Sequence, residues 1–261
     1  MNKKFFDDPI VKKWMPEEMV KWLSKIVMEN FESADNEWGR WKVGYKAKHT
    51  LKVVRWGNRL IEEINEVNWN KRQVIIICFL HDTGRFPQVK QNSYSDTDTG
   101  IDHAALGARM AGENGIDYSK YGVNGAEIVE AIMWHSREKY LGKNPYAKFI
   151  RDADKLACFE DWVEMERDAD DRKLIGTRIN PLIWNQLENR EPIGNELVTT
   201  KAEWVINIAS WLWNINYKAT RKEAVKMGID KILLETFIKN ENPKEDIERL
   251  WKNLEEFRAL T

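Results

Sequence analysis

The chain has four histidines, and each lies on or at the end of an apolar helical stripe. They are His49, His81, His103 and His135. Burying several neutral imidazoles is costly unless something compensates them. Imidazole nitrogen and carboxylate oxygen are natural donors to a divalent metal ion. The four histidines therefore predict a buried metal centre better than four independent packing positions.

The stretch IIICFLHDTGRFPQ, residues 75–88, ends an apolar run in His81 and Asp82 and continues into a Gly84–Arg85 turn. An ionised carboxylate is costly to bury, but a bound metal ion supplies the charge that keeps it ionised. Ligation therefore explains why this buried segment ends in two polar groups.

Two aspartates in RDADKLACF compete for a further ligand position. Asp154 shares its helical face with apolar or small residues, whereas Asp152 lies at helical spacing from Lys148 and Lys155. We expect Asp154 to be the ligand. Asp152 is then a supporting or ion-pairing residue behind the ligands.

The order of His49, the His81–Asp82 pair and a later aspartate in DADKL resembles the HD-domain superfamily of metal-dependent phosphohydrolases. The resemblance covers about residues 45–165. It implies an all-α fold, an HD-domain helical bundle, here with additional C-terminal helices. Family motifs of the DxDK type, in which the aspartate before the lysine coordinates, also favour Asp154.

His103 and His135 go beyond the minimal H…HD…D pattern. With these two extra histidines the chain is similar to superfamily members of two kinds, the cyclic-nucleotide and HD-GYP-type phosphodiesterases and the diiron oxygenases such as myo-inositol oxygenase. The GYP signature of the HD-GYP type is absent here. The alternative is a single ion, with His103 or His135 as a general acid or phosphate donor. The resemblance implies that one ion takes His49, His81, Asp82 and Asp154, and that a second takes Asp82, His103 and His135, which makes Asp82, His103 and His135 the catalytic candidates.

Basic residues near these ligands are candidates for binding a phosphate. Arg85 offers a bidentate fork, and Lys155 offers a point charge beside Asp154. Arg151 and Arg137 are further candidates, and a solvated surface charge is the alternative for each. The polar stretch 91–102 is either a mobile lid or an inert loop. Within it, Asp102 either orients His103 or caps a helix.

These residues predict a phosphohydrolase or phosphodiesterase acting on a nucleotide or another small phosphoester. The cofactor is one or two divalent ions per chain, with Mn, Mg, Fe, Ni, Co and Zn all possible. The alternative is an HD-type diiron oxygenase that cleaves a C–C or C–P bond. A regulatory module without catalysis is a third reading, but keeping so many buried polar groups without a metal would destabilise the fold.

Helical periodicity predicts the elements that position these residues. The run VIIICFL at 74–80 fits a buried strand or a buried helix, and helix is preferred because no alternating segment could pair with a strand. Thr200 and Glu203 predict a capping box. We expect residues 1–44 to pack on the bundle, residues 45–165 to form the metal-binding core, and residues 166–261 to form a helical extension in one compact unit with it.

Composition restricts the partners. Lys and Arg number 41 against 42 Asp and Glu, so no net field attracts nucleic acid or a membrane surface. The longest apolar run is far shorter than the roughly 18 residues of a membrane span, and the N-terminus has no signal core, which predicts a cytoplasmic protein. The two cysteines are expected to be small buried hydrophobes, and the 13 tryptophans to be packing bulk instead of a base-stacking platform. The C-terminal third is a candidate homo-oligomer interface.

Overall fold

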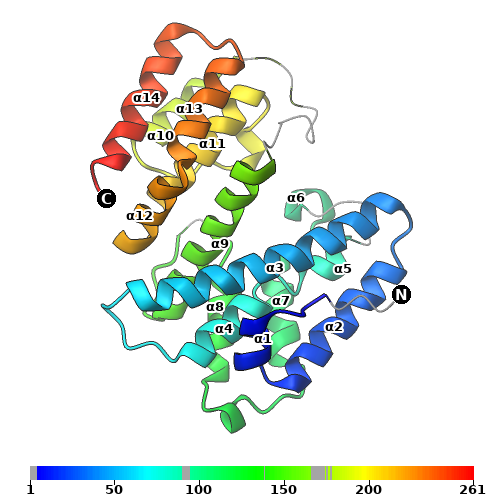
Figure 1. Ribbon diagram of the computed structural model, residues 1–261. Helices are drawn as coiled ribbons and strands as arrows, with labels where there is room; N and C mark the ends of the chain where they lie inside the picture. The colour runs from blue at the N-terminus through cyan, green and yellow to red at the C-terminus, as the bar shows by residue number, and fades with distance from the viewer. Residues whose placement is uncertain (1–4, 90–94, 138, 166–173, 175, 177) are drawn as a thin grey trace. The chain divides into compact units, whose positions relative to one another are not determined.

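The computed structural model describes residues 5–89, 95–137, 139–165, 174, 176 and 178–261 (Figure 1). Helices and short 3-10 turns are joined by loops, and these residues contain no strand. The prediction of an all-α fold is confirmed. The chain divides into two compact units, Met1–Ala157 and Cys158–Thr261.

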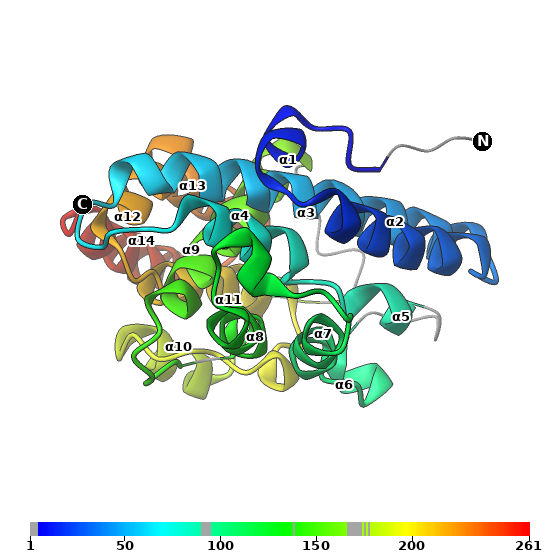
Figure 2. The same cartoon turned by 90° about the horizontal axis from the view of Figure 1, so that it is seen from below.

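The first unit contains the helices that carry the predicted ligands. Helices α2 and α3 run side by side, as do α7 and α8 (Figures 1 and 2). The elements of this unit are α1 (Pro9–Trp14), α2 (Glu17–Glu32), α3 (Glu37–Glu63), α4 (Lys71–Leu80), α5 (Arg85–Val89), α6 (Asp96–Thr99), α7 (His103–Gly112), η1 (Tyr118–Tyr121), α8 (Gly125–Trp134) and most of α9 (Pro145–Met165).

Helix α4 is buried on all sides. Every residue from Gln73 to Leu80 is buried, which is the pattern of a helix surrounded by other elements and explains the missing amphipathic period. The helix begins at the N-cap Asn70, whose side chain accepts from the Gln73 N–H at 3.2 Å. It ends where the Thr83 hydroxyl donates to the Leu80 carbonyl at 2.7 Å. The prediction of a helix here is confirmed.

A tight backbone approach joins the end of α4 to the start of α7. A Cβ atom at Gly84 would overlap the carbonyl oxygen of His103. Glycine at this position therefore lets the chain after Asp82 lie directly against the first turn of α7. Because of this contact, Asp82 and His103 belong to one local structure.

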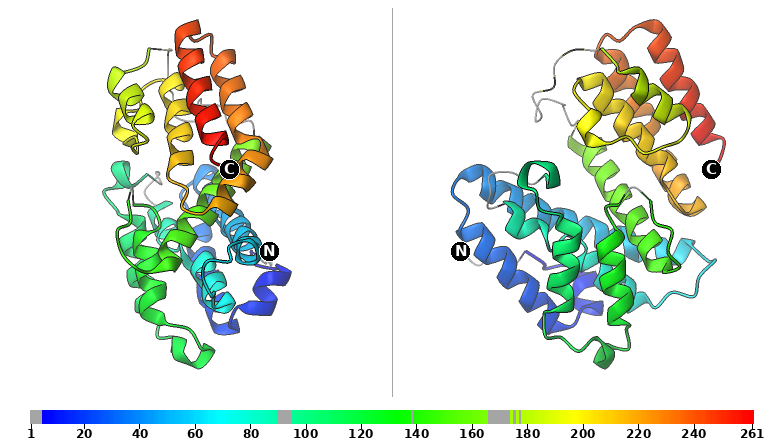
Figure 3. Two further views of the ribbon diagram at one scale, coloured as in Figure 1. Left: turned by 90° about the vertical axis from the view of Figure 1, so that its left-hand side faces the viewer. Right: turned by 180° about the vertical axis from the view of Figure 1, so that it is seen from behind.

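The second unit is a bundle of shorter helices around α11 (Figure 3). Nearly all of α11 is buried, and Thr200 and Glu203 form the predicted capping box at its start. The remaining elements are the end of α9, α10 (Pro181–Glu188), η3 (Asn195–Leu197), α11 (Lys201–Trp213), α12 (Lys218–Met227), α13 (Ile229–Lys239) and α14 (Lys244–Arg258).

The tryptophans and cysteines follow the sequence expectations only in part. Cys78 is fully buried, whereas Cys158 is only partly buried. Trp162, Trp184 and Trp204 are buried, as expected for tryptophans that fill the core. Four tryptophans differ from this expectation, because each keeps more than a third of its surface exposed, and they are Trp38, Trp41, Trp134 and Trp251.

Candidate metal centre

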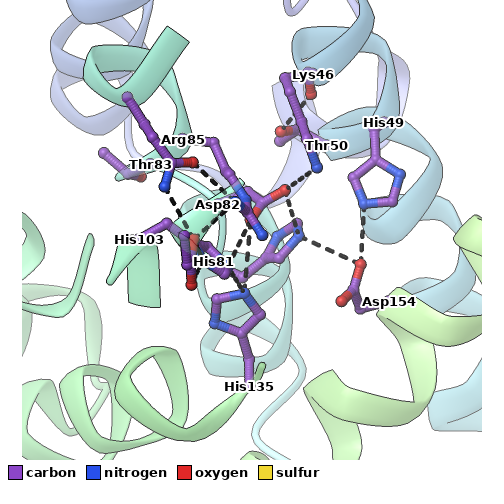
Figure 4. A network of polar contacts seen from close by, with 12 residues as sticks. Lys46, His49, Thr50, His81, Asp82, Thr83, Arg85, His103, His135 and Asp154 are labelled. Atoms are coloured by element: carbon purple, nitrogen blue, oxygen red, sulfur yellow. Dashed lines mark hydrogen bonds and ion pairs between the residues drawn. The ribbon is translucent and has the colours of Figure 1, made fainter. Parts of the chain in front are cut away.

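Five segments of the first unit bring the predicted ligands together (Figure 4). Two of the histidines directly follow a helix, because His81 is the C-cap of α4 and His135 is the C-cap of α8. All four histidines are at most 4% exposed. The cluster consists of His49 on α3, His81 and Asp82 after α4, His103 at the start of α7, His135 after α8, and Asp154 on α9.

One side of the cluster joins His49 and His81 to Asp154. The Nε2 atom of His49 lies 2.9 Å from Oδ1 of Asp154. The Nδ1 atom of His81 lies 2.8 Å from the Cys78 carbonyl and must donate to it, so the proton is inferred to be on Nδ1 and the lone pair on Nε2. This Nε2 is buried without a hydrogen-bond partner, 3.6 Å from Asp82 and 3.7 Å from Asp154. A buried acceptor that faces two carboxylates is a fitting position for a metal ion.

The other side of the cluster joins His103 and His135. The Nδ1 atom of His103 lies 2.8 Å from the Asp96 carboxylate, and the Nδ1 atom of His135 lies 2.7 Å from the Ile132 carbonyl. Both rings therefore donate through Nδ1 and keep a lone pair on Nε2. The two Nε2 atoms are 3.2 Å apart, and each is 3.5 Å from Oδ1 of Asp82.

Two imidazole lone pairs at this separation require a cation between them. Burial lowers the pKa of His103 to about 4 despite the opposing hydrogen bond to Asp96, so a proton on the His103 ring is disfavoured. A divalent ion satisfies both nitrogens and the nearby carboxylate oxygen together. The donor set of this side therefore also fits a metal ion.

Asp82 lies between the two sides (Figure 4). Its Oδ2 faces His81 and its Oδ1 faces His103 and His135. Burial alone would raise the pKa of Asp82, but Lys46 and the surrounding imidazoles hold it well below its usual range. The donor atoms of two triads lie within 4.8 Å of one another, and these triads are His49–His81–Asp82 and Asp82–His103–His135.

Comparison with known proteins agrees with this geometry. Residues 47–158 match the family model of the HD domain. This segment belongs to the HD-domain superfamily. The matched segment contains all six of the predicted ligands. HD domains bind divalent metals and are typically metal-dependent hydrolases. No curated protein and no solved structure matches the chain, and none of the described helices has the length and apolar content to cross a bilayer.

Asp96 supports the HD-domain site and was missed by the sequence analysis. It lies in α6, inside the stretch 91–102 that was predicted to be a lid or an inert loop, of which residues 91–94 lie outside the described residues. Its carboxylate accepts from His103, from Nη1 of Arg85 at 2.8 Å and from Nε2 of Gln88 at 2.9 Å. Burial opposes ionisation, but these donors lower the pKa of Asp96. This carboxylate therefore orients His103.

Two roles were predicted for Asp102, and the structure shows the helix cap. Its side chain accepts from the Ala105 N–H at 3.0 Å and so begins α7. It also forms an ion pair with Arg137. The orienting role predicted as the other alternative is carried by Asp96, which lies on the Nδ1 side of the His103 ring.

The predicted substrate-binding cations have intramolecular partners. Arg85 donates to Gln88 and Asp96, both at 2.8 Å. Arg151 is 4% exposed and donates to the backbone carbonyls of Trp134 and Arg137, on either side of His135. Lys155 donates to the Arg151 carbonyl at 3.4 Å. Arg151 therefore holds the chain around a ligand, and substrate contact by these three residues stays a prediction.

Lys46 is the ammonium group nearest to Asp82. Its Nζ lies 2.8 Å from Oδ2 of Asp82, and its side chain is 13% exposed. It lies three residues before His49 on α3, a spacing that places both side chains on one helical face. That spacing was the available signal, and it was overlooked.

Asp152 and Asp154 have the reverse of the burial expected from the sequence. Asp152 is fully buried, whereas the Asp154 side chain is 24% exposed. Asp154 nevertheless makes the contact with His49, and burial alone would raise its pKa while the His49 and His81 imidazoles hold it well below its usual range.

Proposed function

We propose that this HD domain is a metal-dependent phosphohydrolase that cleaves a phosphoester in a nucleotide or another small molecule. The observation that supports it is the convergence of imidazole Nε2 atoms on two carboxylates, while Nδ1 of His81, His103 and His135 is held by other acceptors. A divalent ion bound by such donors activates water near neutral pH and neutralises charge on phosphoryl oxygens.

The residues of the chain have distinct roles in this proposal. Asp82, kept ionised, serves both sides of the centre. His103 and His135 hold a second ion or, beside a single ion, donate a proton to the leaving oxygen. Lys46 and Arg85 supply positive charge next to Asp82, at 2.8 and 3.8 Å. In this proposal both bind the phosphoryl oxygens of a substrate.

The proposed partner is a small molecule. The nearly equal numbers of acidic and basic residues give no attraction for nucleic acid or for a membrane surface. A cytoplasmic location and assembly into a homo-oligomer belong to the same proposal. Gel filtration with light scattering would test the second of these.

Metal analysis of protein purified without chelator, followed by a screen of phosphoesters, tests the function. We expect bound divalent metal and turnover that chelation abolishes and added metal restores. Substitutions His49→Ala, His81→Ala and Asp82→Ala should remove both metal and turnover while circular dichroism shows retained helix content. Unchanged metal stoichiometry in all three variants, or metal-loaded protein inactive on every phosphoester, would refute the proposal.

A further inference from the structure

A row of stacked aromatic rings on α3 leads to the metal centre. The ring centroids of Trp41 and Tyr45 are 5.7 Å apart with an interplanar angle of 18°. Those of Tyr45 and His49 are 6.3 Å apart at 23°. The spacing of four residues places the three rings on one face of the helix. The row therefore joins an exposed indole to a buried candidate ligand.

Packing does not explain the outer end of this row. Trp41 is 49% exposed, whereas Trp162 in the second unit is 2% exposed. Trp38, three residues earlier on the same helix, is also 38% exposed, and adjacent exposed apolar side chains of this kind mark a binding surface. A contact that only stabilises the helix would explain why the Trp41 ring stacks on the Tyr45 ring. It would not account for a row that continues onto the His49 imidazole.

Lysine side chains accompany the aromatic rings along α3. Nζ of Lys42 lies 4.6 Å from the Trp41 ring centroid and 5.5 Å from that of Trp38. One turn later, Nζ of Lys46 lies 2.8 Å from Asp82 (Figure 4). Lys42 is buried beside the two indoles, so the same helix carries flat apolar rings next to positive charge. This combination suits a ligand with a planar ring and an anionic group.

We infer that Trp41 and Tyr45 form a subsite that stacks the base of the substrate, and that the substrate is a nucleoside phosphate. The inference rests on the proposed function for the phosphoryl end of the molecule. Along the helix axis Tyr45 lies about 6 Å and Trp41 about 12 Å from His49. That separation accommodates a sugar between a stacked base and a phosphoryl group beside Lys46. Trp41 and Tyr45 thereby select for the base.

Matched ligands test the subsite. The four ribonucleoside 5′-monophosphates and ribose 5-phosphate carry the same ester on the same carbon and differ only in the base. Their equilibrium binding to metal-loaded protein and their kcat/KM values are to be measured. Loss of a stacked base costs roughly five- to hundredfold, so wild-type protein should prefer at least one nucleotide over ribose 5-phosphate by that factor. Trp41→Leu and Tyr45→Leu should each lower nucleotide affinity more than ribose 5-phosphate affinity.

Two further variants are controls. Tyr45→Phe keeps the ring and should keep the preference. Trp251→Leu removes an indole of similar exposure, 53%, from α14 and should change neither affinity. Equal binding of nucleotides and ribose 5-phosphate, no binding of either, or a preference unchanged in both Leu variants would overturn the inference. Turnover of both classes at equal kcat/KM would leave the phosphohydrolase standing without this subsite. Ring-dependent nucleotide binding without turnover would leave the subsite and reject the hydrolase.

Discussion

Asp154 contacts a candidate ligand, whereas Asp152 is known to be fully buried, and this difference predicts different phenotypes. Asp154→Asn should lose bound metal, because an amide replaces the charged oxygen that lies 2.9 Å from His49. Asp152→Asn should keep the metal and lower Tm, because it alters a fully buried group. Metal content after dialysis and thermal unfolding of both variants are the measurements. The reverse pattern would show that Asp152 is the ligand.

Asp96 should control metal affinity without binding metal itself. It holds Nδ1 of His103, and loss of such an orienting carboxylate typically costs 10- to 100-fold in metal affinity. Asp96→Asn should therefore weaken binding by about that factor in a metal titration. Asp98→Asn changes an exposed carboxylate of the same short helix and is the matched control. Equal affinities for the two variants would remove Asp96 from the site.

The residues of the site differ in how far the sequence could reveal them. The four histidines were predictable because each follows a helical apolar stripe, and Lys46 was accessible from its spacing to His49. Asp96 was not, because it lies in a polar stretch without periodicity and reaches His103 only once α6 has folded against the start of α7. A contact made by chain folding of this kind leaves no periodic signal.

Helix α4 shows how an ambiguous pattern is resolved by context. Seven consecutive apolar residues have no period, since every face of the helix is buried. The absence of a second strand in the sequence decided for helix, and the structure agrees. The turn after it was marked by Gly84, but the contact of that glycine with His103 depends on the position of α7.

The capping box of α11 predicts a measurable loss of stability. The Thr200 hydroxyl accepts from the Glu203 N–H at 3.2 Å, and Glu203 accepts from the Thr200 N–H at 3.0 Å. Thr200→Ala should lower the free energy of unfolding by about 1 kcal/mol, the usual cost of a lost N-cap. Thr200→Ser retains the hydroxyl and should lose much less. Denaturant unfolding of the three proteins measures this, and equal midpoints would contradict it.

The whole chain divides into two compact units, and the family model matches residues 47–158. The family model ends at residue 158, where the second unit begins. A loss of buried polar residues does not mark this change, because Glu203, Glu223 and Asp230 are buried in the second unit. The predicted boundaries at 44/45 and 165/166 stay predictions. Periodicity identifies the buried face of each helix, but it does not tell which helices share a core.

The number of ions is a property of the complete centre. If Asp82, His103 and His135 hold a second ion, His103→Ala and His135→Ala should each keep about one metal per chain in place of two. Phosphoesterase activity should fall by orders of magnitude, because one ion can stabilise only part of the charge on the attacking and leaving oxygens. Metal analysis paired with kinetics tests both statements. Wild-type protein with a single bound ion and full activity would reject the second ion and keep the hydrolase.

The reaction itself is tested on the same preparations, because an oxygenase of the diiron type uses the same donors. Hydrolysis transfers no electrons, so turnover should be unaffected by removal of dioxygen. It should also be supported by Mg²⁺ or Mn²⁺, which activate water without a change of oxidation state. Anaerobic assays with each metal, together with an oxygen electrode, provide the measurement. Activity that requires iron and consumes dioxygen would instead establish cleavage of a C–C or C–P bond. The six candidate ligands would then keep their positions, and only the chemistry assigned to them would change.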